Sequence, residues 1–185
     1  SGGATLWQSG FLPSTYAGVL FRSQGEPVLN LANPKGLPPE LQRAGLQTLR
    51  DVNRGRYEKI HDPEIASRIA SYELASRMQT AAPELIDLSG ESASTLKAYG
   101  VDRKDPGGGG RGKFGNTQQD FARNCLLARR MVERGVRFIN IVYASWDHHS
   151  QLDKELKYNA HVVDQPIAAL IRDLKQRGLL DSTLV

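Results

Sequence analysis

The chain has 185 residues, of which 39% are hydrophobic and 24% are charged, and it carries a formal net charge of +4. This length allows one domain with a sizeable buried core. No apolar run approaches the ~20 residues that a membrane-spanning helix needs, so we expect no membrane insertion. A single cysteine, Cys125, excludes a disulfide within the chain, and the residues alone leave the cellular compartment open.

The N-terminal part divides by composition into two regions. Residues 1–38 are rich in Gly, Pro, Ser and Asn and show no helical period, which predicts an extended segment laid over a core. Residues 39–104 are predicted to form a helical region. Its first helix opens at Pro39 and carries apolar residues on one side.

Two further helices are predicted within this helical region. Asp62 can accept hydrogen bonds from the free N–H groups of a helix that starts at Pro63, a position where proline is well tolerated. We expect Pro83 to end this helix. A short helix over residues 91–99 follows and is closed by Gly100 in a left-handed conformation.

Residues 105–116 include four consecutive glycines and are predicted to form a mobile surface loop. The segment formally fits G-x-G-x-x-G and most of a P-loop. However, no strand precedes it, and Phe114 stands where a P-loop places the hydroxyl that binds Mg²⁺. We therefore expect no nucleotide to bind here.

Residues 117–185 show the alternation that is typical of a parallel α/β sheet. A helix is predicted over 117–134, a strand over 136–143 that is apolar enough to be covered on both faces, and a helix over 152–177. Residues from Thr183 onward resemble the opening of another strand. We therefore expect part of a mostly parallel sheet flanked by helices, with an extended N-terminal segment and a helical insertion, as one truncated domain of a larger protein.

The credible chemical site lies after the predicted strand, where ligands gather in open parallel sheets. Asp147 and His149 alternate onto one side of an extended loop and offer a carboxylate and an imidazole, which suit Zn²⁺, Mn²⁺ or Fe²⁺. His148 points the other way, and we expect it to support a ligand, face the substrate or serve the structure. In the alternative interpretation, Asp147 or Ser150 simply caps the following helix.

Other candidate residues are weaker. His61 falls in a polar loop, His161 falls off the apolar face of its helix, and Cys125 faces the predicted core. Between Arg103 and Arg137 there are nine basic and three acidic residues. This surplus predicts either a zone that attracts anions or a solvated helix face, and it shows no recognition element for nucleic acid, so we expect none to bind.

Four segments carry a resemblance to a known family: 78–91 (MQTAAPELIDLSGE), 124–130 (NCLLARR), Trp146-Asp147-His148-His149 and 174–181 (LKQRGLLD). The chain resembles the DUF1501 proteins, which are sulfatase-like members of the alkaline-phosphatase superfamily. The resemblance implies an alkaline-phosphatase-like fold and a metal-dependent hydrolase of sulfate or phosphate esters, with two metal ions bridged by a nucleophile. It does not distinguish Zn, Mn, Ca or Mg as the divalent metal.

The same resemblance implies a small anionic ester or a sulfated or phosphorylated glycan as substrate, and export to the periplasm or the cell surface. The superfamily's usual spacing would place a histidine at Gln151, so Gln151 is expected beside the site or facing the substrate. The nucleophile and a second ligand cluster are not in this chain, so we expect no catalytic residue and no activity from it alone. The alternative function is a non-catalytic module that binds a protein or a cell-surface glycan.

Overall fold

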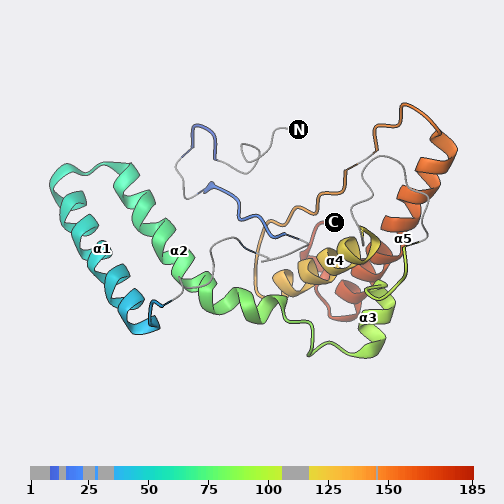
Figure 1. Ribbon diagram of the computed structural model, residues 1–185, viewed down its shortest axis with the longest axis horizontal. Coiled ribbons are helices and arrows are strands. Elements are labelled where there is room, and N and C mark those ends of the chain that lie inside the picture. The colour runs from blue at the N-terminus through green and yellow to red at the C-terminus, as the bar shows by residue number, and fades with distance from the viewer. Residues whose placement is uncertain (1–8, 13–15, 23–27, 29–35, 106–116, 145) are drawn as a thin grey trace. The chain divides into compact units, whose positions relative to one another are not determined.

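The computed structural model describes residues 9–12, 16–22, 28, 36–105, 117–144 and 146–185. The chain divides into two compact units, Ser1–Glu84 and Leu85–Val185. Its elements, in chain order, are α1 (Pro39–Ile60), α2 (Pro63–Ile86), α3 (Ala93–Tyr99), α4 (Thr117–Glu133), α5 (Leu152–Gln176) and the 3-10 turn η3 (Leu180–Ser182) (Figure 1).

The helix starts predicted in the first unit are confirmed. Pro39 is the first residue of α1, where its missing N–H group costs no helical hydrogen bond. The Oδ1 atom of Asp62 accepts a hydrogen bond from the backbone N–H of Glu64 at 2.9 Å, which caps α2. Pro83 does not end α2, which continues to Ile86.

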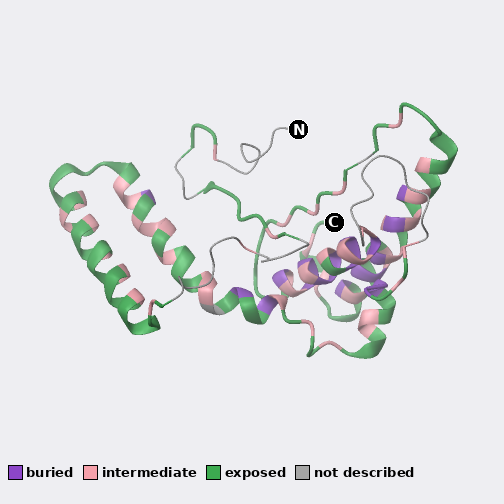
Figure 2. Cartoon of the chain, in the orientation of Figure 1, coloured by how far each residue is buried: buried purple, intermediate pink, exposed green. Residues whose placement is uncertain are grey.

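Side chains of α1 and α2 meet through polar contacts. Gln42 Nε2 donates to Gln79 Oε1 at 3.2 Å, and Arg50 Nε lies 3.2 Å from Glu73 Oε1. None of the residues of α1 is buried (Figure 2). The first helix therefore adds little to any hydrophobic core.

The second unit holds the core of the protein. The apolar residues of α4 and α5 recur at helical spacing, so each helix presents one apolar face, and Figure 2 shows buried residues along both. α3 and the turn after it add Tyr99 and Val101. The buried core consists of Tyr99, Val101, Phe121, Ala122, Cys125, Leu126, Val162, Ala169, Leu170 and Leu174.

The ends of α3 show why this short helix forms. Ser92 Oγ accepts a hydrogen bond from the Thr95 N–H at 3.0 Å at its start. At its end Gly100 has a φ of 78°, a left-handed conformation, and its N–H bonds to the Leu96 carbonyl at 3.0 Å. A Cβ atom at this position would lie 3.1 Å from Gln165 of α5, so glycine also permits a close approach of the two helices.

A buried ionic network joins α4 to its neighbours. The side chain of Arg129 is 3% exposed and lies 2.6 Å from Glu91, 2.7 Å from Glu133 and 3.1 Å from Asp173, while Arg130 lies 2.7 Å from Glu91. Burial acts to lower the pKa of Arg129, but hydrogen bonds to Glu133 and Glu91 outweigh it and raise that pKa. The guanidinium therefore stays charged inside the fold.

The predicted α/β fold is wrong, because the described residues form helices and contain no strand. Residues 136–143 are extended but have no neighbouring strand in the described chain to complete a hydrogen-bonded ladder. Ile141 and Tyr143 pack against the helical core, whereas Phe138 is 89% exposed and Val142 59% exposed. The continuous apolar run in this segment therefore belongs to an irregular chain that packs in part against helices. It does not form a strand within a sheet that is covered on both faces.

The other predictions have mixed outcomes. Residues 180–182 form the 3-10 turn η3, and no strand is formed by the residues that follow. The predicted mobile loop lies, apart from residue 105, outside the described residues, as does most of the predicted N-terminal extended segment. In the part of the chain that the structure describes, no helix is both long and apolar enough to cross a membrane.

Candidate functional site

The candidate site lies in the segment between α4 and α5. α4 closes at Gly135, the chain then runs extended to residue 144, and α5 begins after Gln151. Asp147, His148 and His149 are consecutive in this segment. The side chains of Asp147 and His149 face solvent, whereas the side chain of His148 faces α5.

Asp147 and His149 form the outward-facing pair. Asp147 Oδ2 lies 3.1 Å from His149 Nε2, and the two side chains are 86% and 76% exposed. A carboxylate oxygen and an imidazole nitrogen thus lie in contact on the solvent side of the segment. The structure brings together the two residues that the sequence marked as ligands, and both are donors that divalent transition metals accept.

His148 is held on the other side. Its Nδ1 atom lies 3.1 Å from the Trp146 carbonyl oxygen, and its Nε2 atom lies 3.3 Å from Asn159 Nδ2. Asn159 is a buried residue of α5, 2% exposed, and its Oδ1 accepts a hydrogen bond of 2.8 Å from the Tyr143 hydroxyl. Both ring nitrogens of His148 are therefore occupied by partners within the protein.

Aromatic contacts fix the segment onto α4. The ring of Tyr143 lies edge-on to buried Phe121 at 5.5 Å and to Trp146 at 5.9 Å, and Trp146 lies 6.5 Å from the His148 ring. Burial raises the pKa of Tyr143, with a smaller contribution from the carboxylates of Asp105 and Glu155. The Tyr143 hydroxyl consequently keeps its proton and donates it in a hydrogen bond to Asn159.

The start of α5 bears on the capping alternative. Its N-cap residue is Gln151, which has a left-handed φ of 51° and makes no side-chain hydrogen bond at the cap. The first turn is instead held by backbone bonds of 3.0 Å from the N–H groups of Lys154 and Glu155 to the Gln151 carbonyl. The carboxylate of Asp147 contacts His149, so helix capping does not account for this aspartate.

The weaker candidates lie elsewhere. His61 is exposed at the C-terminal end of α1, and His161 of α5 contacts the guanidinium of Arg103. Cys125 is fully buried, and burial raises the pKa of its thiol to about 12, so the reactive thiolate is scarce.

Sequence reasoning missed Asn159 and Tyr143 as parts of the site. Asn159 lies one helical turn from each of the apolar residues Leu156 and Val163. A polar side chain in that position must find a hydrogen-bond partner or pay a desolvation cost. This was a usable signal, although the partner's identity could not be read from it.

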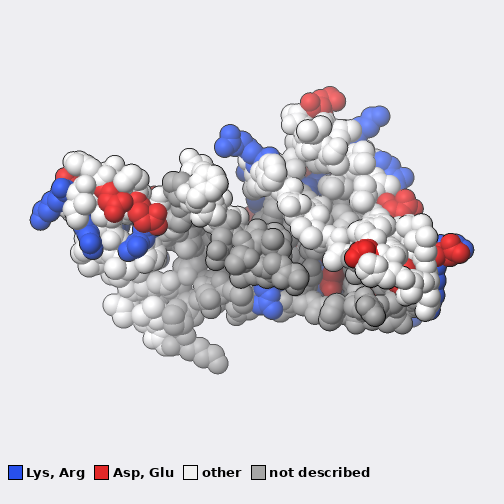
Figure 3. All heavy atoms as spheres, turned by 90° about the horizontal axis from the view of Figure 1, so that it is seen from above, with Lys and Arg blue, Asp and Glu red and all other residues white. Residues whose placement is uncertain are grey.

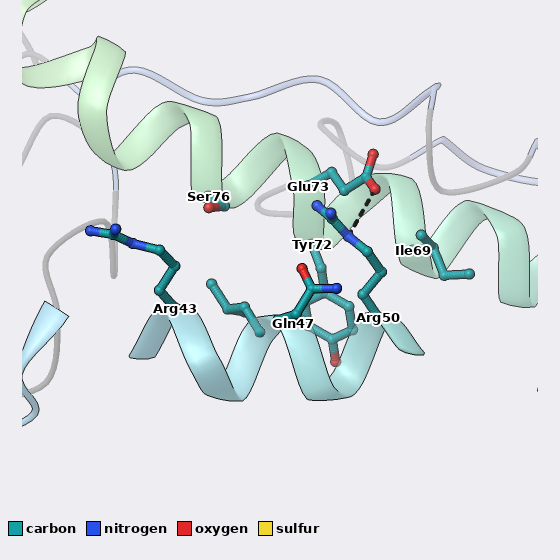
Figure 4. Close-up of a pocket in the computed structure, with 8 residues that line it drawn as sticks. Arg43, Gln47, Arg50, Ile69, Tyr72, Glu73 and Ser76 are labelled. Carbon is teal, nitrogen blue, oxygen red and sulfur yellow. Dashed lines mark ion pairs between the residues drawn. The ribbon is translucent and has the colours of Figure 1, made fainter. Parts of the chain in front are cut away.

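A hollow between α1 and α2 is a second place where polar side chains converge. Figure 4 shows Gln47 and Arg50 of α1 beside Tyr72 and Glu73 of α2, with Arg50 paired to Glu73; Arg43 also lines the hollow. Its volume of about 80 Å³ is far below the roughly 300–1,000 Å³ of small-molecule pockets. It is too small and open to be the leading candidate site.

Several of the basic residues between Arg103 and Arg137 bind partners within the fold. Arg129 and Arg130 are bound to carboxylates in the ionic network, and Arg103 donates to Gln165 at 2.9 Å. Among the described residues on the face seen in Figure 3, basic and acidic side chains are interspersed. These arginines therefore stabilise the fold more than they attract an anion.

Among the described residues, no group of three or more His, Cys, Asp and Glu side chains is arranged to hold a metal ion. The Asp147–His149 pair thus offers two ligands, without a third from the part of the chain that the structure describes.

Comparison with known protein families gives a match over the whole chain. A family model described as "Protein of unknown function (DUF1501)" matches residues 1–185. Neither the curated proteins nor the solved structures include a match to the chain.

Proposed function

The chain belongs to the DUF1501 family, and on that premise we propose that Asp147 and His149 are ligands for a divalent metal ion in a sulfatase-like hydrolase of sulfate or phosphate esters. The observation that carries the proposal is their contact, 3.1 Å between Oδ2 and Nε2 on two exposed side chains. The resemblance of the Trp146–His149 segment to sulfatase-like proteins of the alkaline-phosphatase superfamily supports the reaction class. The proposal rests on the chemistry of these residues and not on the fold.

A metal ion held there would polarise the oxygens of an ester and lower the pKa of a bound nucleophile. Asp147 and His149 would orient that ion, with His148 turned away from it. Two ligands leave most coordination positions to water, whereas complete zinc sites use three or four protein ligands. Binding to this pair alone is consequently weak, and no side chain described beside it serves as a nucleophile.

A non-catalytic binding module is the second candidate. It is favoured by the absence of a third ligand among the described residues and by exposed aromatic side chains, Phe138 at 89% and Trp146 at 47%. Such a module would bind a protein or a sulfated or phosphorylated glycan without turning it over. The two candidates differ in whether a metal ion binds at Asp147.

Calorimetric titration with Zn²⁺ and Mn²⁺ tests the proposal. We expect weak binding to the chain, which Asp147→Asn and His149→Ala each reduce at least about tenfold, because each removes one of two ligands. Asp102→Asn and His61→Ala are matched controls, since both residues are exposed and far from the pair in sequence.

The controls should bind metal as the original chain does, and none of the five proteins should hydrolyse an aryl sulfate or an aryl phosphate. If the two site variants bind metal as well as the controls, the ligand assignment is wrong. If no protein binds metal but a sulfated glycan does bind, the non-catalytic module is the better account.

A further inference from the structure

The hydrogen bonds around His148 determine one another. The Trp146 carbonyl oxygen can only accept, so His148 Nδ1, 3.1 Å away, must carry the proton and donate. In a neutral imidazole the other nitrogen, Nε2, then has a lone pair and accepts from Asn159 Nδ2 at 3.3 Å. The amide's remaining atom, Oδ1, accepts from the Tyr143 hydroxyl at 2.8 Å.

The chain of bonds ends on a rigid support. Asn159 is 2% exposed and belongs to α5, whose neighbours Val162 and Pro166 are also buried. The amide therefore cannot turn to solvent, and its orientation is set by Tyr143 on one side and His148 on the other. Such a fully bonded, buried polar group holds its partners in one geometry.

Fixing His148 also fixes its neighbours. Residues 146–148 have no regular structure and the chain bends at residues 149–150, so the inward anchoring of His148 leaves Asp147 and His149 together on the solvent side. Their mutual contact and their exposure agree with this arrangement.

We propose that Asn159 is a positioning residue of the site: it locks His148 as the Nδ1–H tautomer with Nε2 occupied, and thereby presents Asp147 and His149 as a pair. His148 is then excluded as a metal ligand although it lies between two of them. The part of this inference that concerns metal rests on the proposed function, whereas the part that concerns the tautomer does not.

The test is the ring ¹⁵N spectrum of His148 in metal-free protein, labelled at its four histidines, with Zn²⁺ titration as a separate measurement. We expect a protonated Nδ1 and an unprotonated Nε2 in the original chain. Asn159→Asp keeps the shape but replaces the donor by an acceptor, so it should place a proton on Nε2, with or without loss of the proton that Nδ1 donates to the Trp146 carbonyl. Tyr143→Phe leaves the amide donor in place and should preserve the Nδ1–H tautomer.

Asn140→Asp is the matched charge control, because Asn140 is exposed in the same segment. Zn²⁺ affinity should fall roughly 10–100-fold in Asn159→Asp, as for other residues that orient a ligand, and stay unchanged in Asn140→Asp. A proton on Nε2 in the original chain would overturn the inference whether or not any variant folds. So would an Nε2 that stays unprotonated in folded Asn159→Asp, or an unchanged Zn²⁺ affinity of that variant. If the original chain binds no Zn²⁺, the proposed function fails, while the spectrum still decides the tautomer lock.

Discussion

Replacing Glu91 by glutamine tests the buried ionic network directly. The Glu91 side chain is 8% exposed, and its two oxygens lie 2.6 Å from Arg129 and 2.7 Å from Arg130. Glutamine keeps the shape, but it removes the charge and points an amide donor at a guanidinium. Breaking a buried pair costs about 3–5 kcal/mol, and we expect the lower end because Arg129 retains Glu133 and Asp173.

That loss is large against the ~5–15 kcal/mol by which domains are stable. It corresponds to a fall of roughly 6–12 °C in the melting temperature for a protein of this size. Urea unfolding followed by Trp146 fluorescence, in a Trp7→Phe background, reports on the right unit because Trp146 contacts Tyr143 on the core. Glu58→Gln on the exposed surface of α1 is the control and should stay within about 0.5 kcal/mol.

The destabilisation caused by Glu91→Gln is expected to depend on pH. Burial acts to raise the pKa of Glu91, but hydrogen bonds from Arg130 and Arg129 outweigh it and lower that pKa below its ordinary value of 4.5. A lowered folded pKa adds stability that is present above 4.5 and is lost as the pH falls through the folded value. The difference in the free energy of unfolding between the original protein and Glu91→Gln should therefore be constant near neutral pH and become smaller below pH 4.5. A gap under about 0.5 kcal/mol at neutral pH, or one that widens in acid, would refute the reasoning.

Two further predictions concern packing and backbone conformation. Leu174→Ala, at a side chain that is 1% exposed, should lower the free energy of unfolding by about 2–5 kcal/mol, whereas Leu49→Ala on exposed α1 should change it little; equal effects in urea unfolding would contradict the assigned core. Gly100→Ala should destabilise by about 1–2 kcal/mol, because φ is 78° and the new Cβ would lie 3.1 Å from Gln165. Gly45→Ala inside α1, where nothing lies within 4 Å, should instead stabilise by about 0.5–1 kcal/mol. Thermal melts that show the same sign for both glycine variants would argue against the left-handed cap.

The helices were predictable from the sequence because their signals are local. Asp62 before Pro63, the glycine after Tyr99 and the apolar spacing of α4 act within one or two turns, and each was confirmed. The prediction of a strand over 136–143 was wrong, because a strand forms only with a neighbouring strand to pair with, and a local sequence pattern does not show whether one is present. The run is apolar partly because Ile141 and Tyr143 pack onto helices, a contact that alternation along the chain does not reveal.

The candidate site was predictable to the extent that side-chain alternation is local. It placed Asp147 and His149 on one side and His148 on the other, which is the arrangement in the structure. The support from Asn159 was not predictable, because it depends on how α5 packs against the preceding segment. Whether the pair binds metal stays a prediction.

The burial of the only cysteine has a practical consequence. Because Cys125 is fully buried and its thiol pKa is about 12, a thiol reagent can modify it only after α4 and α5 separate. The rate at which the reagent modifies Cys125 in native buffer therefore measures how often the second unit opens spontaneously, and no cysteine has to be introduced by mutation. Cys125 is thus a built-in reporter of how often the helical core opens.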